Sequence, residues 1–115
     1  MVGVGVPTQF SFAARQGGVL STRDLSELSN LGAVGDISLR YFDAHGRAVV
    51  SSLDGRIIGL EREQIRRIPC VIGVAGGMAK LAAVRGALRG HLLNVLVTDI
   101  YVARRINEEV ERGQL

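Results

Sequence analysis

An apolar run that ends in a glycine pair constrains the fold of this chain more than any other feature. Val71 to Ala75 are apolar or glycine, Gly76 and Gly77 follow, and Lys80 stands three residues further on. In an α/β fold this pattern is typical of a parallel strand and the start of the next helix, where free N–H groups and the helix dipole favour an anion. The spacing is neither Gly-x-Gly-x-x-Gly nor a nucleotide P-loop. It predicts a phosphate or carboxylate site, although a glycine bend and a solvated Lys80 would give the same pattern.

Length and charge narrow the class of protein. The 115 residues, 47% of them hydrophobic, suit one domain spanning residues 1–115. The net charge of +3 and the pI of about 9.8 are compatible with nucleic-acid binding, but the arginines alternate with acids along the chain. The densest group, Arg62, Arg66 and Arg67, is expected to form a solvated helix face and not a contact with phosphate backbones.

Ligands for a metal are scarce in this sequence. Cys70 is the single cysteine, so the chain cannot form an internal disulfide or a cysteine-based zinc cluster. His45 and His91 have no partner at metal-ligand spacing, and we expect neither a metal nor another cofactor. The single cysteine fits a reducing cytoplasm. No apolar run approaches the length of about 20 residues that a membrane helix requires, which predicts a soluble protein.

The amino-terminal half is expected to form a strand, a loop or short helix, a helix and an antiparallel hairpin. Ser21 and Asp24 have the spacing of a helix N-cap and its partner acid. Asp43 to Gly46 are typical turn residues, so the strand before them is expected to pair with the segment after them. The expected ranges are 2–6, 8–18, 22–31, 36–42 and 47–50.

The carboxyl-terminal half alternates between strand and helix patterns. The expected strands are 56–60, 70–75 and 92–97, and the expected helices are 61–68, 78–88 and one capped by Thr98 or Asp99 with Val102, Ile106 and Val110 facing inward. Parallel strands joined by helices open toward the same sheet edge, which would bring Gly76, Gly77, Lys80, Thr98 and Asp99 around one crevice. The pattern predicts an α/β fold with a partial Rossmann-like parallel sheet, flanking helices and a small antiparallel hairpin.

Several motifs, taken in order, resemble SorC-type bacterial sugar-responsive transcription regulators over nearly the whole chain. They are Gly32-Ala33-Val34-Gly35-Asp36-Ile37, Phe42-Asp43 with Gly46, Ile68-Pro69 before Val71–Gly77 and Lys80, and Asn94-Val95-Leu96-Val97-Thr98-Asp99.

This resemblance implies the carboxyl-terminal part of an effector-binding domain, similar in fold to ribose-5-phosphate isomerase and glucosamine-6-phosphate deaminase. Such a domain senses a phosphorylated sugar and alters how an attached helix-turn-helix domain holds DNA. That DNA-binding domain would lie on the amino-terminal side and is absent from this sequence, so contact with DNA would be indirect. A homo-oligomer is also expected.

The resemblance further implies which residues contact the ligand. Asp36 matches the acid of the Gly-Asp-Ile motif and would accept hydrogen bonds from sugar hydroxyls. Gly76, Gly77 and Lys80 match the Gly-Gly-x-x-Lys turn, whose lysine would meet a phosphate or sugar oxygen. The alternative for Asp36 is a carboxylate that bonds nearby loop amides.

For two other residues that match the family, a structural role is at least as good an explanation as a ligand contact. Asp99 matches the acid after the last strand, but Thr-Asp is also good helix-capping chemistry. Arg15 is a weaker candidate for a phosphate contact, and a surface charge explains it better. The family commonly has Leu-Asn-Asp-Arg where this chain has Leu53-Asp54-Gly55-Arg56, which weakens any expectation of a ligand contact from that loop.

Two functions other than sensing a sugar phosphate are also possible. An isomerase or deaminase acting on a sugar phosphate would need an acid and a base in the crevice, and only Asp36 and Asp99 are candidates. Without a neighbouring His or Cys the chain is expected not to be an enzyme. The third possibility is a fragment that serves chiefly in oligomerisation, because a truncated sheet would expose apolar surface.

Overall fold

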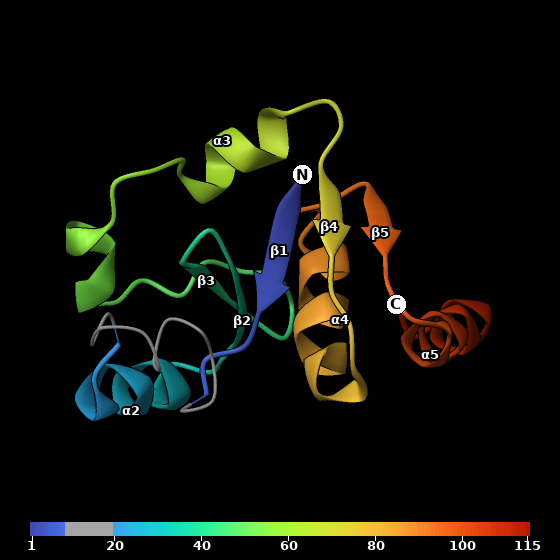
Figure 1. Ribbon diagram of the computed structural model, residues 1–115, viewed down its shortest axis with the longest axis horizontal. Coiled ribbons are helices and arrows are strands. Elements are labelled where there is room, and N and C mark those ends of the chain that lie inside the picture. Colours follow the sequence, from blue (N-terminus) through green and yellow to red (C-terminus); the bar gives the residue numbers. More distant parts are fainter. Residues whose placement is uncertain (9–19) are drawn as a thin grey trace.

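The computed structural model of the protein describes residues 1–8 and 20–115, and Figure 1 shows how its elements are arranged. The strands are β1 (Val2–Gly5), β2 (Ala33–Ile37), β3 (Arg40–Asp43), β4 (Ile72–Val74) and β5 (Val95–Val97). The helices are α2 (Thr22–Asn30), α3 (Arg62–Arg67), α4 (Leu81–Arg89) and α5 (Ile100–Glu111), and the short 3-10 helices are η1 (Ser52–Arg56) and η2 (Met78–Lys80). Because η2 leads directly into α4, one continuous helical segment begins at Met78.

The described strands form one sheet in the order β3-β2-β1-β4-β5. Strands β1, β4 and β5 are parallel, whereas β2 is antiparallel to both β1 and β3. Helix α4 connects β4 to β5, as parallel strands require a crossover of this kind. The predicted α/β fold, with a partial parallel sheet, flanking helices and a small antiparallel hairpin, is confirmed.

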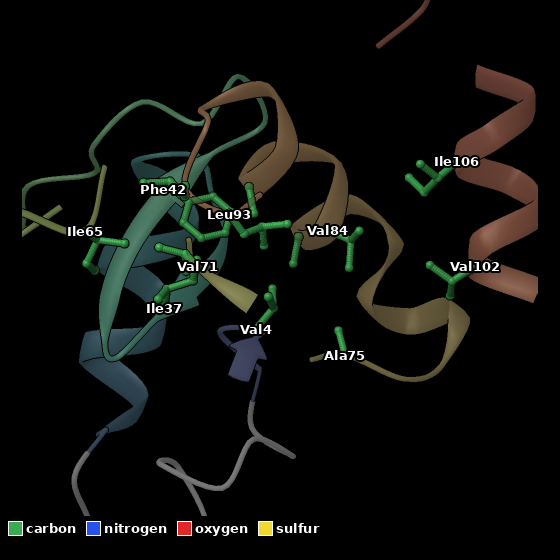
Figure 2. Packing of buried hydrophobic residues seen from close by; sticks show 13 residues of the cluster. Val4, Ile37, Phe42, Ile65, Val71, Ala75, Val84, Leu93, Val102 and Ile106 are labelled. Atoms are coloured by element: carbon green, nitrogen blue, oxygen red, sulfur yellow. The ribbon is translucent and has the colours of Figure 1, made fainter. Parts of the chain in front are cut away.

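Apolar side chains form two clusters, one on each side of the sheet. Phe42 and Tyr41 are neighbours in β3 and therefore point to opposite faces. Tyr41 packs with Leu28 of α2 and Leu53 of η1 in the smaller cluster. In the larger cluster, shown in Figure 2, side chains of the strands meet side chains of α4 and α5. Its members include Val4, Ile37, Phe42, Val84, Val102 and Ile106.

The hairpin differs from the prediction. Residues 36–42 are not one strand, because Ser38 and Leu39 form a two-residue turn with positive φ angles of 52° and 63° that separates β2 from β3. The predicted turn at Asp43–Gly46 is present, and the Asp43 carboxylate accepts the N–H groups of His45 and Arg47. The segment that follows is not a strand, and only an isolated bridge joins Ala48 to Phe42.

The predicted strand at 56–60 is also wrong, because η1 ends at Arg56 and no strand follows it before α3. Two buried arginines, Arg40 and Arg62, lie next to this segment. The Arg40 guanidinium donates to the Asp54 carboxylate at 3.2 Å and to Glu61 at 3.0 Å. Arg62 donates to the backbone oxygens of Tyr41 and Val49, each at 2.7 Å, and approaches Asp54 at 3.4 Å. Arg62 is therefore not part of a solvated helix face, because carbonyl oxygens and Asp54 replace its water.

Helix α5 presents a carboxylate, and not an apolar side chain, at the inner side of its last turn. Val102 and Ile106 are buried as predicted, but Val110 is 54% exposed and Glu109 is 5% exposed. The two Glu109 oxygens accept from the Arg85 guanidinium of α4 at 2.6 and 2.8 Å. The ion pair with Arg85 turns Glu109, and not Val110, toward the interior at the end of α5. The spacing of apolar residues alone does not predict this.

Replacing Glu109 with glutamine is expected to lower the free energy of unfolding by about 2 kcal/mol, because a charge-assisted bidentate contact is lost. The hydrogen bonds and charge of Arg85 lower the pKa of Glu109 to about 2, from 4.5. An acid with a lowered pKa stabilises the fold above its unfolded value, so this contribution should disappear as the pH falls from 4.5 toward 2. Urea unfolding across this range measures it.

The matched control for that variant is the neighbouring Glu108→Gln, which removes a charge from an exposed position. It should change stability by less than about 0.5 kcal/mol. Equal effects of the two substitutions would show that the contact between Arg85 and Glu109 does not hold α5 in place.

Candidate functional site

Asp36 lies on β2 at the carboxyl end of the neighbouring strand β1, where it pairs in register with Gly5. Its Oδ2 accepts the Leu39 N–H at 3.0 Å, and a Cβ added at Gly5 would clash with its Oδ1. Burial raises the pKa of Asp36, and the Leu39 N–H and the charge of Lys80 lower it by less. Gly5 is not among the predicted site residues, although the alternation of glycine and valine in β1 indicates that one face of this strand lacks side chains.

Asp99 holds the glycine turn and the last helix together. Its Oδ1 accepts the Val102 N–H at 2.9 Å and thus caps α5, while its Oδ2 accepts the Gly77 N–H at 2.6 Å. These hydrogen bonds lower the pKa of Asp99. The capping alternative therefore describes what Asp99 does in this structure, and Asp99, not Thr98, is the N-cap of α5. A ligand contact of Asp99 stays a prediction.

Asp36, Gly76 and Asp99 stand in one row across the carboxyl edge of the parallel strands. Gly5 pairs with Asp36, and continuing the observed register by two residues brings Gly76 level with Gly5 and Asp99 level with Gly76. Neighbouring strands lie about 4.8 Å apart, so Asp36 is roughly 10 Å from Gly76 and roughly 14 Å from Asp99. The two carboxylates lie at opposite ends of this row and do not form a pair.

Lys80 is the only lysine in the sequence, and it stands three residues after the glycine pair. It is the last residue of η2 and is partly exposed, and its charge is close enough to Asp36 to lower the pKa of that carboxyl group. The first N–H groups of a helical segment have no acceptor within it. In this turn the Gly77 N–H donates to the Asp99 carboxylate, and the Lys80 N–H donates to the Gly77 carbonyl oxygen.

The structure separates Thr98 from the predicted crevice. Thr98 lines a cavity of about 700 Å³ together with Leu96 and residues of α5 such as Ala103 and Asn107. Its Oγ1 is buried, with no hydrogen-bond partner among the described residues. Arg15, the weakest of the predicted site residues, lies outside the described residues.

The residues that do come together can bind a polyol with a negative charge. Asp36 accepts hydrogen bonds and Lys80 supplies a positive charge. The Gly77 N–H already donates to Asp99, so a ligand would have to replace that hydrogen bond to use it. An acid and a base for proton transfer would both have to contact a substrate, but Asp36 and Asp99 are at opposite ends of the row. Among residues 1–8 and 20–115, no group of three His, Cys, Asp or Glu side chains could hold a metal ion.

Comparison with known proteins agrees with this fold. The family model described as a sugar-binding domain matches residues 1–107. The chain therefore belongs to the sugar-binding domain family of DeoR- and SorC-type transcriptional regulators. It is 43% identical over 74 residues to the deoxyribonucleoside regulator of Bacillus subtilis, which covers 64% of this chain and 24% of that protein. It is 44% identical over 69 residues to the transcriptional regulator LsrR of Escherichia coli, or 59% of this chain and 22% of LsrR.

Solved structures of regulators share the same architecture. A DeoR family transcriptional regulator from Listeria monocytogenes has a TM-score of 0.86 and 33% identity, over 91% of this chain and 42% of that one. The full-length sorbitol operon regulator SorC from Klebsiella pneumoniae has a TM-score of 0.80 and 28% identity, over 91% of this chain and 34% of SorC. This chain thus spans about a quarter of the curated relatives and less than half of these solved structures.

None of the helices within residues 1–8 and 20–115 has the length and apolar composition needed to cross a membrane.

Proposed function

We propose that this chain is the carboxyl-terminal, ligand-sensing portion of the effector-binding domain of a bacterial transcriptional regulator, that its ligand is a phosphorylated sugar, and that it is not an enzyme. The observation that carries the proposal is the row across the carboxyl edge of β1 and β4. A hydroxyl acceptor, Asp36, stands at one end, and a glycine turn with Lys80 follows two strands away. Membership of the sugar-binding domain family supports the sugar part of this ligand.

The phosphate part of the ligand is inferred from the chemistry of the turn. Asp36 can bind hydroxyl groups but repels an anion, whereas Lys80 and the backbone N–H groups attract one. A ligand spanning roughly 10 Å between these groups, two strand spacings, needs hydroxyls at one end and a negative charge at the other. A five- or six-carbon sugar phosphate has this form. The candidate contacts are Asp36, Gly76, Gly77 and Lys80, with Asp99 and Arg15 as weaker candidates.

The rest of the proposed function concerns the DNA-binding domain that the family resemblance implies. In a complete cytoplasmic regulator, occupation of the site would alter how a helix-turn-helix domain on the amino-terminal side, within a homo-oligomer, holds DNA. The relatives support this context, because they are transcriptional regulators several times longer than the matched segment.

The single lysine permits a direct test of the site. The chain is treated briefly with acetic anhydride, alone and with ribose-5-phosphate or glucosamine-6-phosphate, and the acetylation of Lys80 is measured by mass spectrometry. A bound sugar phosphate should slow acetylation of Lys80 but not that of the amino-terminal amine, which is the internal control. Ribose and inorganic phosphate, tested separately, show whether both parts of the ligand are required. Equal labelling of Lys80 under all conditions would contradict the proposed site.

The variant Asp36→Asn should separate stability from binding. The raised pKa of Asp36 means that its negative charge destabilises the fold at neutral pH, and that this penalty disappears as the pH falls through the folded pKa toward 3.8. The variant should therefore melt at the same or a higher temperature than the wild type at neutral pH, with no such advantage below 3.8. It should bind the protecting sugar phosphate at least about tenfold more weakly, because a hydrogen bond to a charged group is lost.

Calorimetric titration and thermal denaturation of the same samples measure both effects. Unchanged affinity in Asp36→Asn would place the sugar elsewhere. Turnover of either sugar phosphate by the wild type, lost in Asp36→Ala, would favour an isomerase or deaminase over a sensor.

A further inference from the structure

A cavity of about 470 Å³ lies beside the turn that joins β2 to β3. It is bounded by that hairpin, by the residue before the cap of α2, and by η1 with the segment that follows it. We call it the hairpin cavity, and its walls include Leu20, Leu39, Tyr41, Leu53, Ile57 and Ile58. Small-molecule sites have volumes of about 300–1,000 Å³ and mostly apolar walls, so the hairpin cavity has the size and the lining of a ligand site.

The walls of the hairpin cavity are apolar from their buried to their exposed side. Leu53 is buried, Ile57 is half-buried, and Ile58 is fully exposed to solvent. A ligand that covers these side chains removes apolar surface from water, which is favourable. Arg56 also lines the cavity, but its guanidinium donates to the Asp24 carboxylate at 2.9 Å, so its charge is paired. The lining therefore favours an uncharged molecule.

Tyr41 is a buried polar side chain in this wall. It is 3% exposed, yet among residues 1–8 and 20–115 no group forms a hydrogen bond with its hydroxyl. Burial and the nearby charges of Asp36 and Asp24 raise the pKa of Tyr41, so the hydroxyl remains a donor. A buried donor without an acceptor costs free energy, which an acceptor inside the cavity would recover. The two carboxylates would repel an anion, so that acceptor should be neutral.

We propose that the hairpin cavity binds a small, uncharged, mainly apolar molecule that carries one oxygen acceptor for the Tyr41 hydroxyl. Such a molecule differs from a sugar phosphate in both charge and polarity, so it would occupy a site separate from the row at Asp36 and Lys80. The two sites are adjacent, because Leu39 lines the cavity and its N–H donates to Asp36 at 3.0 Å. The test of this cavity needs no sugar phosphate and is independent of the proposed function.

Acetophenone and ethylbenzene are suitable probes, because they have similar shape and only acetophenone carries a carbonyl oxygen. Each is titrated into the chain while the backbone amides are followed by ¹H–¹⁵N NMR. Both should cause saturating shifts of the Leu39 and Ile57 amides, and acetophenone should bind about fivefold more tightly, by one hydrogen bond. Absence of saturation, or shifts confined to the larger cavity lined by Ala103 and Asn107, would overturn the proposal.

Tyr41→Phe removes the hydroxyl and keeps the ring. It should weaken the binding of acetophenone about fivefold and leave that of ethylbenzene unchanged, because only the carbonyl uses the hydroxyl. The variant should melt at the same or a higher temperature than the wild type, since it removes a donor without a partner. Tyr101→Phe, at an exposed position of α5, is the matched control and should change neither affinity.

Two results with Tyr41→Phe would contradict the proposal. An equal loss of affinity for both probes would assign the hydroxyl no contact with a ligand, and a lower melting temperature would show that the hydroxyl already has a partner in the fold. If Tyr41→Phe does not melt cooperatively, Ile57→Trp decides, because its larger side chain fills the mouth of the cavity. This variant should no longer bind either probe, and unchanged binding would overturn the proposal.

Discussion

Replacing Asp54 with asparagine is expected to lower the free energy of unfolding by about 3 kcal/mol, because two buried guanidinium groups lose their shared carboxylate. Arg40 is 2% exposed and Arg62 is 8% exposed, and both lie within hydrogen-bond distance of Asp54 Oδ1. Asparagine keeps the shape but has one acceptor oxygen, so it can accept either the Ser51 N–H or the guanidinium N–H groups, and the negative charge is lost in both cases. The remaining acceptors of the two arginines are mostly neutral carbonyl oxygens, which do not neutralise a buried positive charge.

The pH dependence of stability provides an independent measure of the same interaction. Burial raises the pKa of Asp54, but the Ser51 N–H and the two arginines lower it more, and the net result lies below 3.8. Its contribution to stability is therefore present above 3.8 and is lost as the pH falls below that value. Urea unfolding should show a steeper acid loss in the wild type than in Asp54→Asn.

The control for this prediction is Glu63→Gln, at the surface of α3. Glu63 pairs with Arg66 at 3.4 Å and its side chain is 63% exposed, so its removal should change stability by less than about 1 kcal/mol. A loss in Asp54→Asn no larger than in Glu63→Gln would mean that water reaches the two arginines in the folded protein.

Gly46→Ala is expected to destabilise the protein by at least about 3 kcal/mol, since it combines backbone strain with a clash. Gly46 has a φ of +79°, and a Cβ added there would overlap the backbone of Gly90 and the carbonyl oxygen of Gly86. Neither obstacle is the end of a flexible side chain. Arg66 also donates to the Gly46 and Gly90 oxygens, each at 3.0 Å, and fixes the close approach from the outside.

Gly32→Ala separates the backbone strain expected in Gly46→Ala from the steric clash. Gly32 has a φ of +80°, nearly the same as Gly46, but a Cβ there would meet nothing within 4 Å. It should lose only about 1–2 kcal/mol, the strain of a left-handed backbone. Both variants are compared by urea unfolding and by near-ultraviolet circular dichroism. Equal losses would show that α4 moves away from the hairpin without penalty.

The order of elements around the glycine turn could be predicted from the sequence because each signal is local. The capping pair of Ser21 and Asp24 forms both hydrogen bonds of a capping box, and the helices at 22–30 and 62–67 fall within the expected ranges. Strands β4 and β5 are shorter than the apolar runs that contain them, because the ends of these runs turn into loops. The carboxyl ends of the parallel strands open at the same edge, as the crossover rule requires.

The errors have a common physical origin in contacts between residues distant in sequence. A two-residue hairpin turn normally uses glycine or asparagine, and nothing in Ser38 and Leu39 signals the positive φ angles that the surrounding sheet imposes. Arg62 is buried because Tyr41 and Val49 direct carbonyl oxygens at it, and Glu109 because Arg85 lies opposite. These partners are 13 to 24 residues away, beyond the reach of any periodic pattern.

The candidate site was predictable only in part, for the same reason. The residue types at Asp36, Gly76, Gly77 and Lys80 indicated their chemistry, and strand order then placed Asp36 near Lys80. The role of Gly5 could not be inferred, because it depends on the antiparallel pairing of β1 with β2.

The carboxylate of Asp99 links two parts of the molecule mechanically. The turn after β4 and the first turn of α5 are each held to it by one short hydrogen bond, so neither can shift by an ångström without pulling the other or breaking a bond. A ligand that displaces that turn would therefore also displace the start of α5. Because α5 is 12 residues long, the movement would reach its carboxyl end, away from the ligand.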